Sequence, residues 1–247
     1  MNLILLTPAE IDSARLAVLT DARSEHIRSV LRAGVSDFVR VGLLNGPRGT
    51  GRVVAMDPER VELECVFDAE PPPRPRVDLL LALPRPKVMK RLWAQLAALG
   101  VGRILLTNAA RVERNYFDTH IIDPAFFTPL LIEGLQQAQD TRLPTVSIHR
   151  QIKPLIEDNL SDLSDAANRI VLHPGAPMPL RDAVRPSAAE RVLMAIGPEG
   201  GWVPFELDLL AAHGFRSVHL GSRTLRSDTA CIAALSVVQA AFDSPND

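Results

Sequence analysis

The order of apolar and polar residues divides the chain into two parts with different secondary structure. In the first part apolar and polar residues alternate, most clearly over residues 37–43, and this period is typical of a half-buried strand. The same reasoning predicts strands over 52–56 and 61–67, a turn over 45–51 and a short helix over 24–31. Short strands separated by turn residues favour a small β-barrel within residues 1–70.

A proline-rich segment ends this first part. Residues 71–76 contain four prolines in six positions, which favours an extended linker and excludes regular structure. Beyond it, residues 77–83 form a nearly continuous apolar run, as expected for a strand covered on both faces. Further strands are predicted over 103–107, 145–149, 169–173, 192–196 and 217–220, and helices over 87–99, 124–139, 204–213 and 227–242. Strands that alternate with helices predict an open parallel α/β sheet.

Two of these strands are followed by glycine-rich loops, at residues 196–202 and 220–226. In a parallel sheet such loops lie at the carboxyl ends of strands, where ligands bind. Glycine lets backbone N–H groups approach a ligand closely and adopts positive φ without strain. The loops therefore predict a small-molecule pocket built largely of main chain, and the alternative is that the glycines only close strand-to-helix turns.

Composition sets limits on this picture. The 247 residues carry a formal net charge of −2, and 47% are hydrophobic, as in ordinary globular proteins. Because there is no apolar run of about eighteen residues and no basic, apolar start, we expect neither a membrane span nor a secretory signal. Cys65 and Cys231 lie far apart, with no second Cys or His at ligand spacing, so we expect no disulfide framework, no metal site and a cytoplasmic location.

The basic residues are distributed unevenly. Residues 83–116 contain seven Lys and Arg residues against a single acid, Glu113, although the chain as a whole is slightly acidic. A local basic surface of this kind can bind phosphates of a nucleic acid. The alternative interpretation of the same charges is a solvated helix face.

Several segments together match one known family. They are residues 26–32, 37–41 and 45–46 in the first part, and 82–87, 99–101, 111–113, 172–175, 196–201 and 220–226 in the second. In this order they resemble the RsmE family, bacterial 16S rRNA methyltransferases of the SPOUT class. A lone Gly-Pro-Glu-Gly-Gly is a weak signal, but three such loops in the family's order behind a barrel-like first part are specific.

The resemblance implies more than the residue pattern does. It implies a PUA-like RNA-binding β-barrel over residues 1–70, a linker over 71–76 and a SPOUT methyltransferase domain over 77–247 that contains a deep trefoil knot. It implies S-adenosyl-L-methionine as the cofactor and N3 of a uridine in 16S rRNA of the small ribosomal subunit as the acceptor. It also implies a homodimer in which both chains help to build each active site.

The sequence departs from the family pattern at three positions. Ala98 stands where the family often has Glu, and Asp228 stands where it usually has Glu, which keeps the carboxylate but shortens the side chain. Arg142 is displaced by two positions, which makes substrate contacts near it less secure than the cofactor loops.

The expected cofactor contacts are apolar side chains, backbone groups and glycines of the three loops. They are Leu172, His173, Pro174, Gly175, Ile196, Gly197, Glu199, Gly200, Gly201, Leu220, Gly221, Ser222, Leu225 and Arg226.

Three residues are candidates for the chemical step. Methylation of N3 requires loss of the imide proton, and Arg226 would stabilise the negative charge that develops on the ring. Glu199 would orient a substrate or cofactor group, or would only complement the dipole of the following helix. Asp228 is a candidate proton acceptor, with dipole complementation in the first turn of the last helix as the alternative. His173 ranks behind these three because a His that closes a strand is more often structural.

The expected RNA contacts are Arg28, Arg32, Arg85, Lys87, Arg111 and Arg114, which would bind phosphates. Two other functions remain open at this stage: a methyltransferase of the same fold that acts on another RNA base, and a non-catalytic RNA-binding assembly protein. A nucleotide-binding oxidoreductase is set aside because no Gly-x-Gly-x-x-Gly follows an early strand.

Overall fold

A computed structural model describes residues 3–184 and 191–243 of the chain. It divides into two compact units. The first unit comprises Met1–Arg74 together with Ile132–Leu143, and the second comprises Pro75–Leu131 together with Pro144–Asp247. Among the described residues, no helix is long and apolar enough to cross a membrane.

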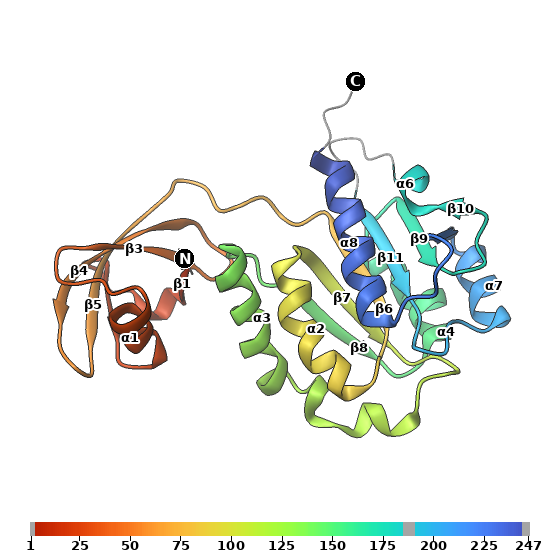
Figure 1. The fold of residues 1–247 in the computed structure, drawn as a ribbon, viewed down its shortest axis with the longest axis horizontal. Coiled ribbons are helices and arrows are strands. Elements are labelled where there is room, and N and C mark those ends of the chain that lie inside the picture. The colour runs from red at the N-terminus through yellow and green to blue at the C-terminus, as the bar shows by residue number, and fades with distance from the viewer. Residues whose placement is uncertain (1–2, 185–190, 244–247) are drawn as a thin grey trace. The chain divides into compact units, whose positions relative to one another are not determined.

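The first unit is a five-stranded, curled sheet in the order β1-β3-β4-β5-β2 (Figure 1). Strand β1 runs parallel to β3, and the other neighbours are antiparallel. The strands are β1 (Ile4–Leu6), β2 (Leu16–Leu19), β3 (Phe38–Leu43), β4 (Arg48–Met56) and β5 (Val61–Phe67), and the helical segments are η1 (Pro8–Glu10), α1 (Ala22–Glu25) and η2 (His26–Val30).

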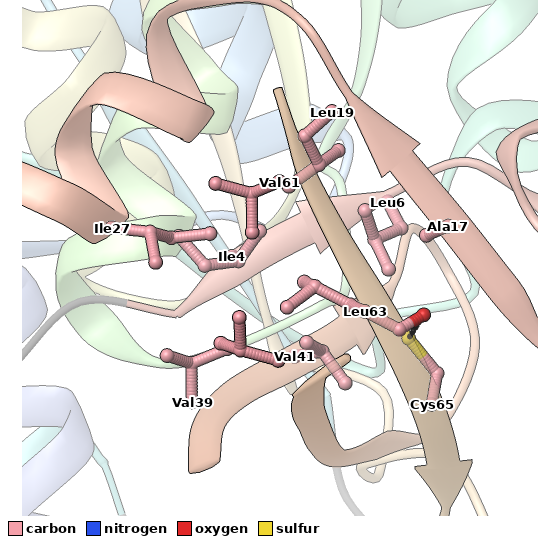
Figure 2. Close-up of a cluster of buried hydrophobic side chains, with 11 residues drawn as sticks. Ile4, Leu6, Ala17, Leu19, Ile27, Val39, Val41, Val61, Leu63 and Cys65 are labelled. Atoms are coloured by element: carbon pink, nitrogen blue, oxygen red, sulfur yellow. Dashed lines mark hydrogen bonds between the residues drawn. The ribbon is translucent and has the colours of Figure 1, made fainter. Parts of the chain in front are cut away.

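The core of this unit follows from the alternation seen in the sequence. Val39 and Val41 of β3 point into the same apolar cluster as Val61 and Leu63 of β5 (Figure 2). The cluster is completed by Ile4, Leu6, Ala17, Leu19, Ile27, Val53 and Cys65. Burial of this cluster is the main force that closes the sheet. The predicted strands over 37–43 and 61–67 and the helical turn over 24–31 are confirmed.

The predicted turn over 45–51 is wrong in its second half, because β4 begins at Arg48. Gly49 is a strand residue that faces β5 closely. A Cβ at Gly49 would collide with the Val66 carbonyl oxygen and lie 2.8 Å from the Cα of Phe67. Glycine is needed here for close strand pairing, and sequence reasoning mistook it for a turn signal.

The segment 132–143 belongs to the first unit although it is distant in sequence. The N–H of Leu3 donates to the Gln136 carbonyl at 3.0 Å, and the N–H of Asn45 donates to the Thr141 carbonyl at 2.7 Å. The linear division at residues 71–76 assigned this segment to the second part of the chain. Local patterns carry no information about such long-range backbone contacts.

The second unit is a seven-stranded sheet in the order β10-β12-β9-β11-β6-β7-β8, with every pair of neighbours parallel. The strands are β6 (Val77–Ala82), β7 (Val101–Thr107), β8 (Thr145–His149), β9 (Asn168–Leu172), β10 (Met178–Pro179), β11 (Val192–Ile196) and β12 (Arg216–His219). The main helices are α2 (Pro86–Ala98), α3 (Pro124–Ala138), α7 (Pro204–Ala212) and α8 (Ser227–Asp243). Shorter helical segments are η3 (Arg114–Asp118), η4 (His120–Ile122), α4 (Ile152–Pro154), η5 (Leu155–Asn159), α5 (Leu160–Leu163) and α6 (Leu180–Ala183).

The central strands of this sheet are covered on both faces. Every residue of β6 and β11 is buried, as the continuous apolar runs predicted, and α2 packs against α8 over the sheet (Figure 1). Strand β11 lies between β6 and β9, both of which precede it in the sequence. The knot implied by the family resemblance stays a prediction.

Candidate active site

The carboxyl ends of β9, β11 and β12 border a cavity of about 260 Å³. These strands are parallel neighbours, so the loops that follow them leave the sheet at the same edge. The cavity is lined by Arg111, Leu172, His173, Pro174, Ile196, Gly197, Pro198, Glu199, Gly200, Gly201, Trp202, Val218, His219, Leu220, Gly221, Arg223, Thr224, Leu225, Ser227 and Ala230.

The cavity brings together most of the residues that the sequence singled out. Eleven predicted cofactor contacts lie in its wall: Leu172, His173, Pro174, Ile196, Gly197, Glu199, Gly200, Gly201, Leu220, Gly221 and Leu225. The predicted residues Gly175, Ser222, Arg226 and Asp228 are not part of the lining. Arg111, expected to bind RNA, lies in the wall instead.

Two glycines shape the loop after β11. A Cβ at Gly197 would lie 3.2 Å from Nε1 of Trp202, so glycine allows the buried indole to pack against the backbone. Gly201 has φ +72°, and its N–H donates to the Pro198 carbonyl at 2.8 Å. A side chain at this position would be strained because L residues rarely adopt positive φ. The loop conformation therefore depends on both glycines.

Arg111 reaches this loop from the segment after β7. Its Nη1 donates to the Gly200 carbonyl at 2.5 Å. The preceding residue, Ala110, donates its N–H at 2.7 Å to buried Glu206 in α7, whose other carboxylate oxygen accepts from the Val203 N–H at 2.9 Å. Glu206 thus joins two segments of the cavity wall. Sequence analysis missed it, and the only signal was an acid in the first turn of the helix after the loop.

The loop after β12 is held by its own backbone. Gly221 has φ +122°, and its N–H donates to Nδ1 of His219 at 2.9 Å. Leu220 and Leu225 supply apolar surface to the cavity on either side of this turn. The resulting wall combines apolar side chains with main-chain groups, as the sequence predicted.

Asp228 joins two arginines beside the cavity. Its Oδ2 lies 3.2 Å from Nη2 of Arg91 in α2 and 3.3 Å from Nη2 of Arg226. The carboxylate is mostly buried, whereas two thirds of the Arg226 side chain is exposed. Burial and the neighbouring Asp228 carboxylate raise the pKa of the Cys231 thiol, which therefore stays protonated and is a poor nucleophile.

Glu199 makes a contact that neither sequence interpretation anticipated. Its Oε1 accepts a hydrogen bond of 3.1 Å from the backbone N–H of Arg85. Glu199 therefore joins the loop after β11 to the loop after β6.

Tyr116 follows Arg111 in the sequence. Its hydroxyl donates to Glu113 at 2.9 Å, and burial, together with that carboxylate, raises the pKa of the Tyr116 phenol.

The remaining predicted RNA contacts lie in both units. In the first unit Arg28 forms an ion pair with Glu25 at 2.8 Å and donates to the Asp57 carbonyl, while Arg32 has an exposed side chain in left-handed backbone. In the second unit Arg85, Lys87 and Arg114 are all exposed. No carboxylate among the described residues forms an ion pair with Arg32, Lys87 or Arg114.

Two polar atoms of the cavity residues have no hydrogen-bond partner among the described residues. They are Nε1 of Trp202 and Oγ of Ser227, and the two residues are 4% and 5% exposed. An unsatisfied buried N–H or O–H costs about 1–3 kcal/mol, and folded proteins leave few of them. Each of these two groups can therefore bond to a water molecule or to a ligand.

Comparison with known proteins places this arrangement in a family. Residues 70–239 match the profile of the RNA methyltransferase domain. A ribosomal RNA small subunit methyltransferase E from Treponema pallidum is 31% identical over 97% of this chain and 91% of its own length. The chain belongs to the ribosomal RNA small subunit methyltransferase E family. A further member, from Borreliella burgdorferi, is 26% identical over 95% of both chains.

Solved structures show the same fold. A ribosomal RNA small subunit methyltransferase E from Neisseria gonorrhoeae, bound to S-adenosyl methionine, superposes with a TM-score of 0.77 at 21% identity over 97% of both chains. A putative methyltransferase from Legionella pneumophila, in complex with the same cofactor, gives 0.74 at 22% identity over 98% of both chains. The predicted fold class, a PUA-like barrel with a SPOUT α/β domain, is confirmed for this member of the methyltransferase E family.

Proposed function

We propose that this chain transfers the methyl group of S-adenosyl-L-methionine to N3 of a uridine in 16S rRNA. The observation that carries the proposal is the meeting of three glycine-containing loops around one cavity in a member of an rRNA methyltransferase family. Relatives at similar length are named for small-subunit rRNA, and two solved structures of the same fold contain the cofactor.

The cavity residues fit this cofactor. S-adenosylmethionine offers an apolar adenine face together with ring nitrogens, hydroxyl groups and a carboxylate that accept hydrogen bonds. The leucines of the wall suit the adenine, and Nε1 of Trp202 and Oγ of Ser227 can donate to such acceptors. Glycine at 197, 200 and 201 keeps the wall free of side chains, so backbone groups can approach the ligand.

The cofactor, when bound, supplies an electrophilic methyl group, and the residues of the chain position it and handle the acceptor. We propose that Arg226 faces the acceptor base, since its guanidinium is exposed beside the cavity and would stabilise negative charge on the uracil ring. The Asp228 carboxylate forms ion pairs with the guanidinium groups of Arg226 and Arg91. We therefore assign Asp228 a positioning role, and not the role of proton acceptor that the sequence suggested.

Glu199 is likewise a positioning residue in this proposal. Its hydrogen bond to the Arg85 N–H keeps the loop after β11 next to a basic segment that contains Arg85 and Lys87. That segment, with Arg111 and Arg114 after β7, would bind RNA phosphates near the acceptor. Because Arg111 donates to the Gly200 carbonyl, we assign it first to the cavity wall.

Three wider features complete the proposal. The first unit would bind RNA as a PUA-like barrel, the enzyme would work in the cytoplasm where the 16S rRNA is located, and two chains would form a homodimer. The family resemblance supports the dimer, and light scattering of the purified chain tests it directly. No group of three or more His, Cys, Asp or Glu among the described residues could hold a metal ion, and the expectation that none is needed stays a prediction.

The test is methyl transfer to defined RNA. Purified chain would be incubated with labelled S-adenosylmethionine and either free 16S rRNA or small subunits from a strain that lacks the enzyme. We expect label in 16S rRNA, with mass spectrometry of nuclease fragments locating it on N3 of one uridine. Label on another base would overturn the assignment of uridine N3 as the acceptor but would leave the proposed methyl transfer standing. Cofactor binding without any transfer to RNA would overturn the catalytic proposal.

A further inference from the structure

The first unit has a groove that the proposed methyl transfer does not use. It is lined by His26, Val30, Leu31, Arg32, Ala33, Asp37, Phe38, Val39 and Arg40, from the end of η2 to the start of β3. Two of these side chains are large, apolar and well exposed, Phe38 at 69% and Val30 at 65%. Both line the same groove, and exposed apolar side chains that lie together mark interaction sites more often than single ones do.

The register of β3 fixes the direction of the side chains. Val39 and Val41 point into the apolar cluster of the first unit (Figure 2). Because side chains alternate along a strand, Phe38 and Arg40 project together from the opposite, solvent face. Two residues of a strand span roughly 7 Å, so the Cα atoms of Phe38 and Arg40 are separated by about the length of one nucleotide.

The groove also carries a net positive charge, from Arg32 and Arg40 against the single acid Asp37. Among the described residues no carboxylate forms an ion pair with Arg32 or Arg40, and Arg40 bonds only to the neutral amide of Gln139. The one acid in the lining, Asp37, accepts the Gly34 N–H at 2.8 Å. By contrast Arg52, which lies opposite Phe38 on β4, is neutralised by Glu64 at 2.6 Å. The charges near the ring therefore favour an anionic ligand.

A third observation is a polar atom that lacks a partner. Nε2 of His26, in the groove wall, is buried and makes no hydrogen bond to any described residue. Buried polar groups without partners are few in folded proteins, and a bound water or ligand is one way in which such a group is satisfied. The groove thus combines an aromatic face, two guanidinium groups and an unsatisfied imidazole nitrogen.

We propose that this groove binds one unstacked nucleotide of the RNA substrate, with its base on the ring of Phe38 and its phosphate on Arg32 and Arg40. Aromatic rings bind the faces of bases in single strands, whereas paired bases in a duplex are already stacked and cannot reach a ring. The inference rests on the proposed rRNA substrate. It goes beyond that proposal, because it assigns a single-strand binding site on the barrel, apart from the cofactor cavity.

The experiment compares RNA binding by the full-length chain and three variants. Fluorescence anisotropy would measure the affinity for a short single-stranded oligouridylate and for a hairpin duplex of equal length. The variants are Phe38→Ala, Phe38→Tyr and, as a matched control, Val18→Ala, which truncates an exposed apolar residue of β2 outside the groove. Each variant would also be titrated with S-adenosylmethionine.

We expect Phe38→Ala to weaken oligouridylate binding by roughly tenfold, because base stacking on an aromatic ring is worth about that much. Phe38→Tyr and Val18→Ala should bind as the unchanged chain does, and duplex binding should be the same in all four proteins. A fourth variant, Arg40→Gln, serves to measure salt dependence: it should reduce the slope of log affinity against log salt by about one unit, whereas Phe38→Ala should leave that slope unchanged.

Equal oligouridylate affinity for Phe38→Ala and the unchanged chain would overturn the inference and leave this face to a protein partner. An equal loss on single strand and duplex would also overturn it, because stacking requires an unpaired base. Failure of the proposed function would give a different result. The unchanged chain and every variant would then transfer no methyl group to rRNA, whatever their affinities for oligouridylate.

Discussion

Arg111 and Gly200 are in direct contact at the wall of the cavity. The guanidinium of Arg111 donates to the Gly200 carbonyl at 2.5 Å, and a Cβ at Gly200 would lie 3.0 Å from Cδ of Arg111. The contact joins the segment after β7 to the loop after β11. A side chain at position 200 would therefore press on Arg111, which would have to shift by a few tenths of an ångström.

The first prediction concerns this contact. In Gly200→Ala the new methyl group must displace Arg111, which distorts the cavity wall, and we expect cofactor affinity to fall by roughly tenfold or more for a displaced hydrogen bond and its packing. Calorimetry with S-adenosylmethionine measures the change. The matched control is Gly214→Ala, where φ is +84° and no atom lies near a Cβ. That variant should lose about 1 kcal/mol of stability through backbone strain but keep its affinity. An unchanged affinity in Gly200→Ala would refute the assignment of this wall.

The second prediction separates the roles of Arg226 and Asp228. Asp228→Asn weakens the hold on both arginines, so we expect kcat to fall by roughly tenfold or less, from the loss of a charge-assisted hydrogen bond, with little change in cofactor affinity. Arg226→Ala should reduce kcat further, and Asp228→Glu should restore most of the activity. If Asp228 were the proton acceptor, Asp228→Asn would abolish the acidic limb of the pH–rate profile, and persistence of that limb is what the positioning role predicts.

The third prediction uses the unsatisfied hydroxyl of Ser227. Ser227→Ala removes a buried O–H that has no partner in the described part of the chain, so the free protein should gain up to about 1 kcal/mol of stability. The same change removes a donor to the cofactor and should weaken cofactor binding several-fold. Thermal unfolding without cofactor and calorimetry with it measure the two effects. A loss in both measurements would show that the hydroxyl is only structural.

The fourth prediction concerns pH. Asp78 is buried in β6, with Arg191 at 2.6 Å, and burial raises the pKa of its carboxyl above the ordinary value of 3.8 despite that arginine. The unfolded chain therefore releases this proton at lower pH than the folded chain, and the contribution to stability is lost as pH rises through the folded pKa. Relative to Asp78→Asn, the unchanged chain should lose stability as pH rises above about 4 in urea unfolding. A relative gain over that range would contradict the assigned direction.

The sequence predicted the strands and helices better than the contacts between segments that are distant in the chain. Continuous apolar runs identified β6 and β11, and alternation identified β3 and β5, because both patterns are dictated by which faces are buried. The three-residue strand β1 carries too short a pattern to show a period. The contacts of 132–143 with the rest of the first unit join residues about a hundred positions apart or more, as in the Asn45–Thr141 bond, and have no local signature.

The candidate site shows the same division. Glycine and strand ends located its three loops, because turns and parallel strands have local signals. The partners of its charged groups were not predictable, since Glu206 binding to Ala110 and Asp228 binding to Arg91 depend on how distant segments pack. The sequence therefore made Asp228 a candidate residue but could not show that two arginines share its carboxylate.

The most direct test of the cavity as the cofactor site uses the only two tryptophans of the chain. Nε1 of Trp93 donates to the Ile121 carbonyl at 3.1 Å, and its ring stacks on Phe127, neither of which lines the cavity. Nε1 of Trp202 has no hydrogen-bond partner within residues 3–184 and 191–243. A nitrogen-15 spectrum should show two indole signals, which Trp93→Phe would assign. Addition of S-adenosylmethionine should move the Trp202 signal downfield, as a new hydrogen bond forms, and leave that of Trp93 unchanged. A Trp202 signal that stays in place at a saturating cofactor concentration would contradict the account.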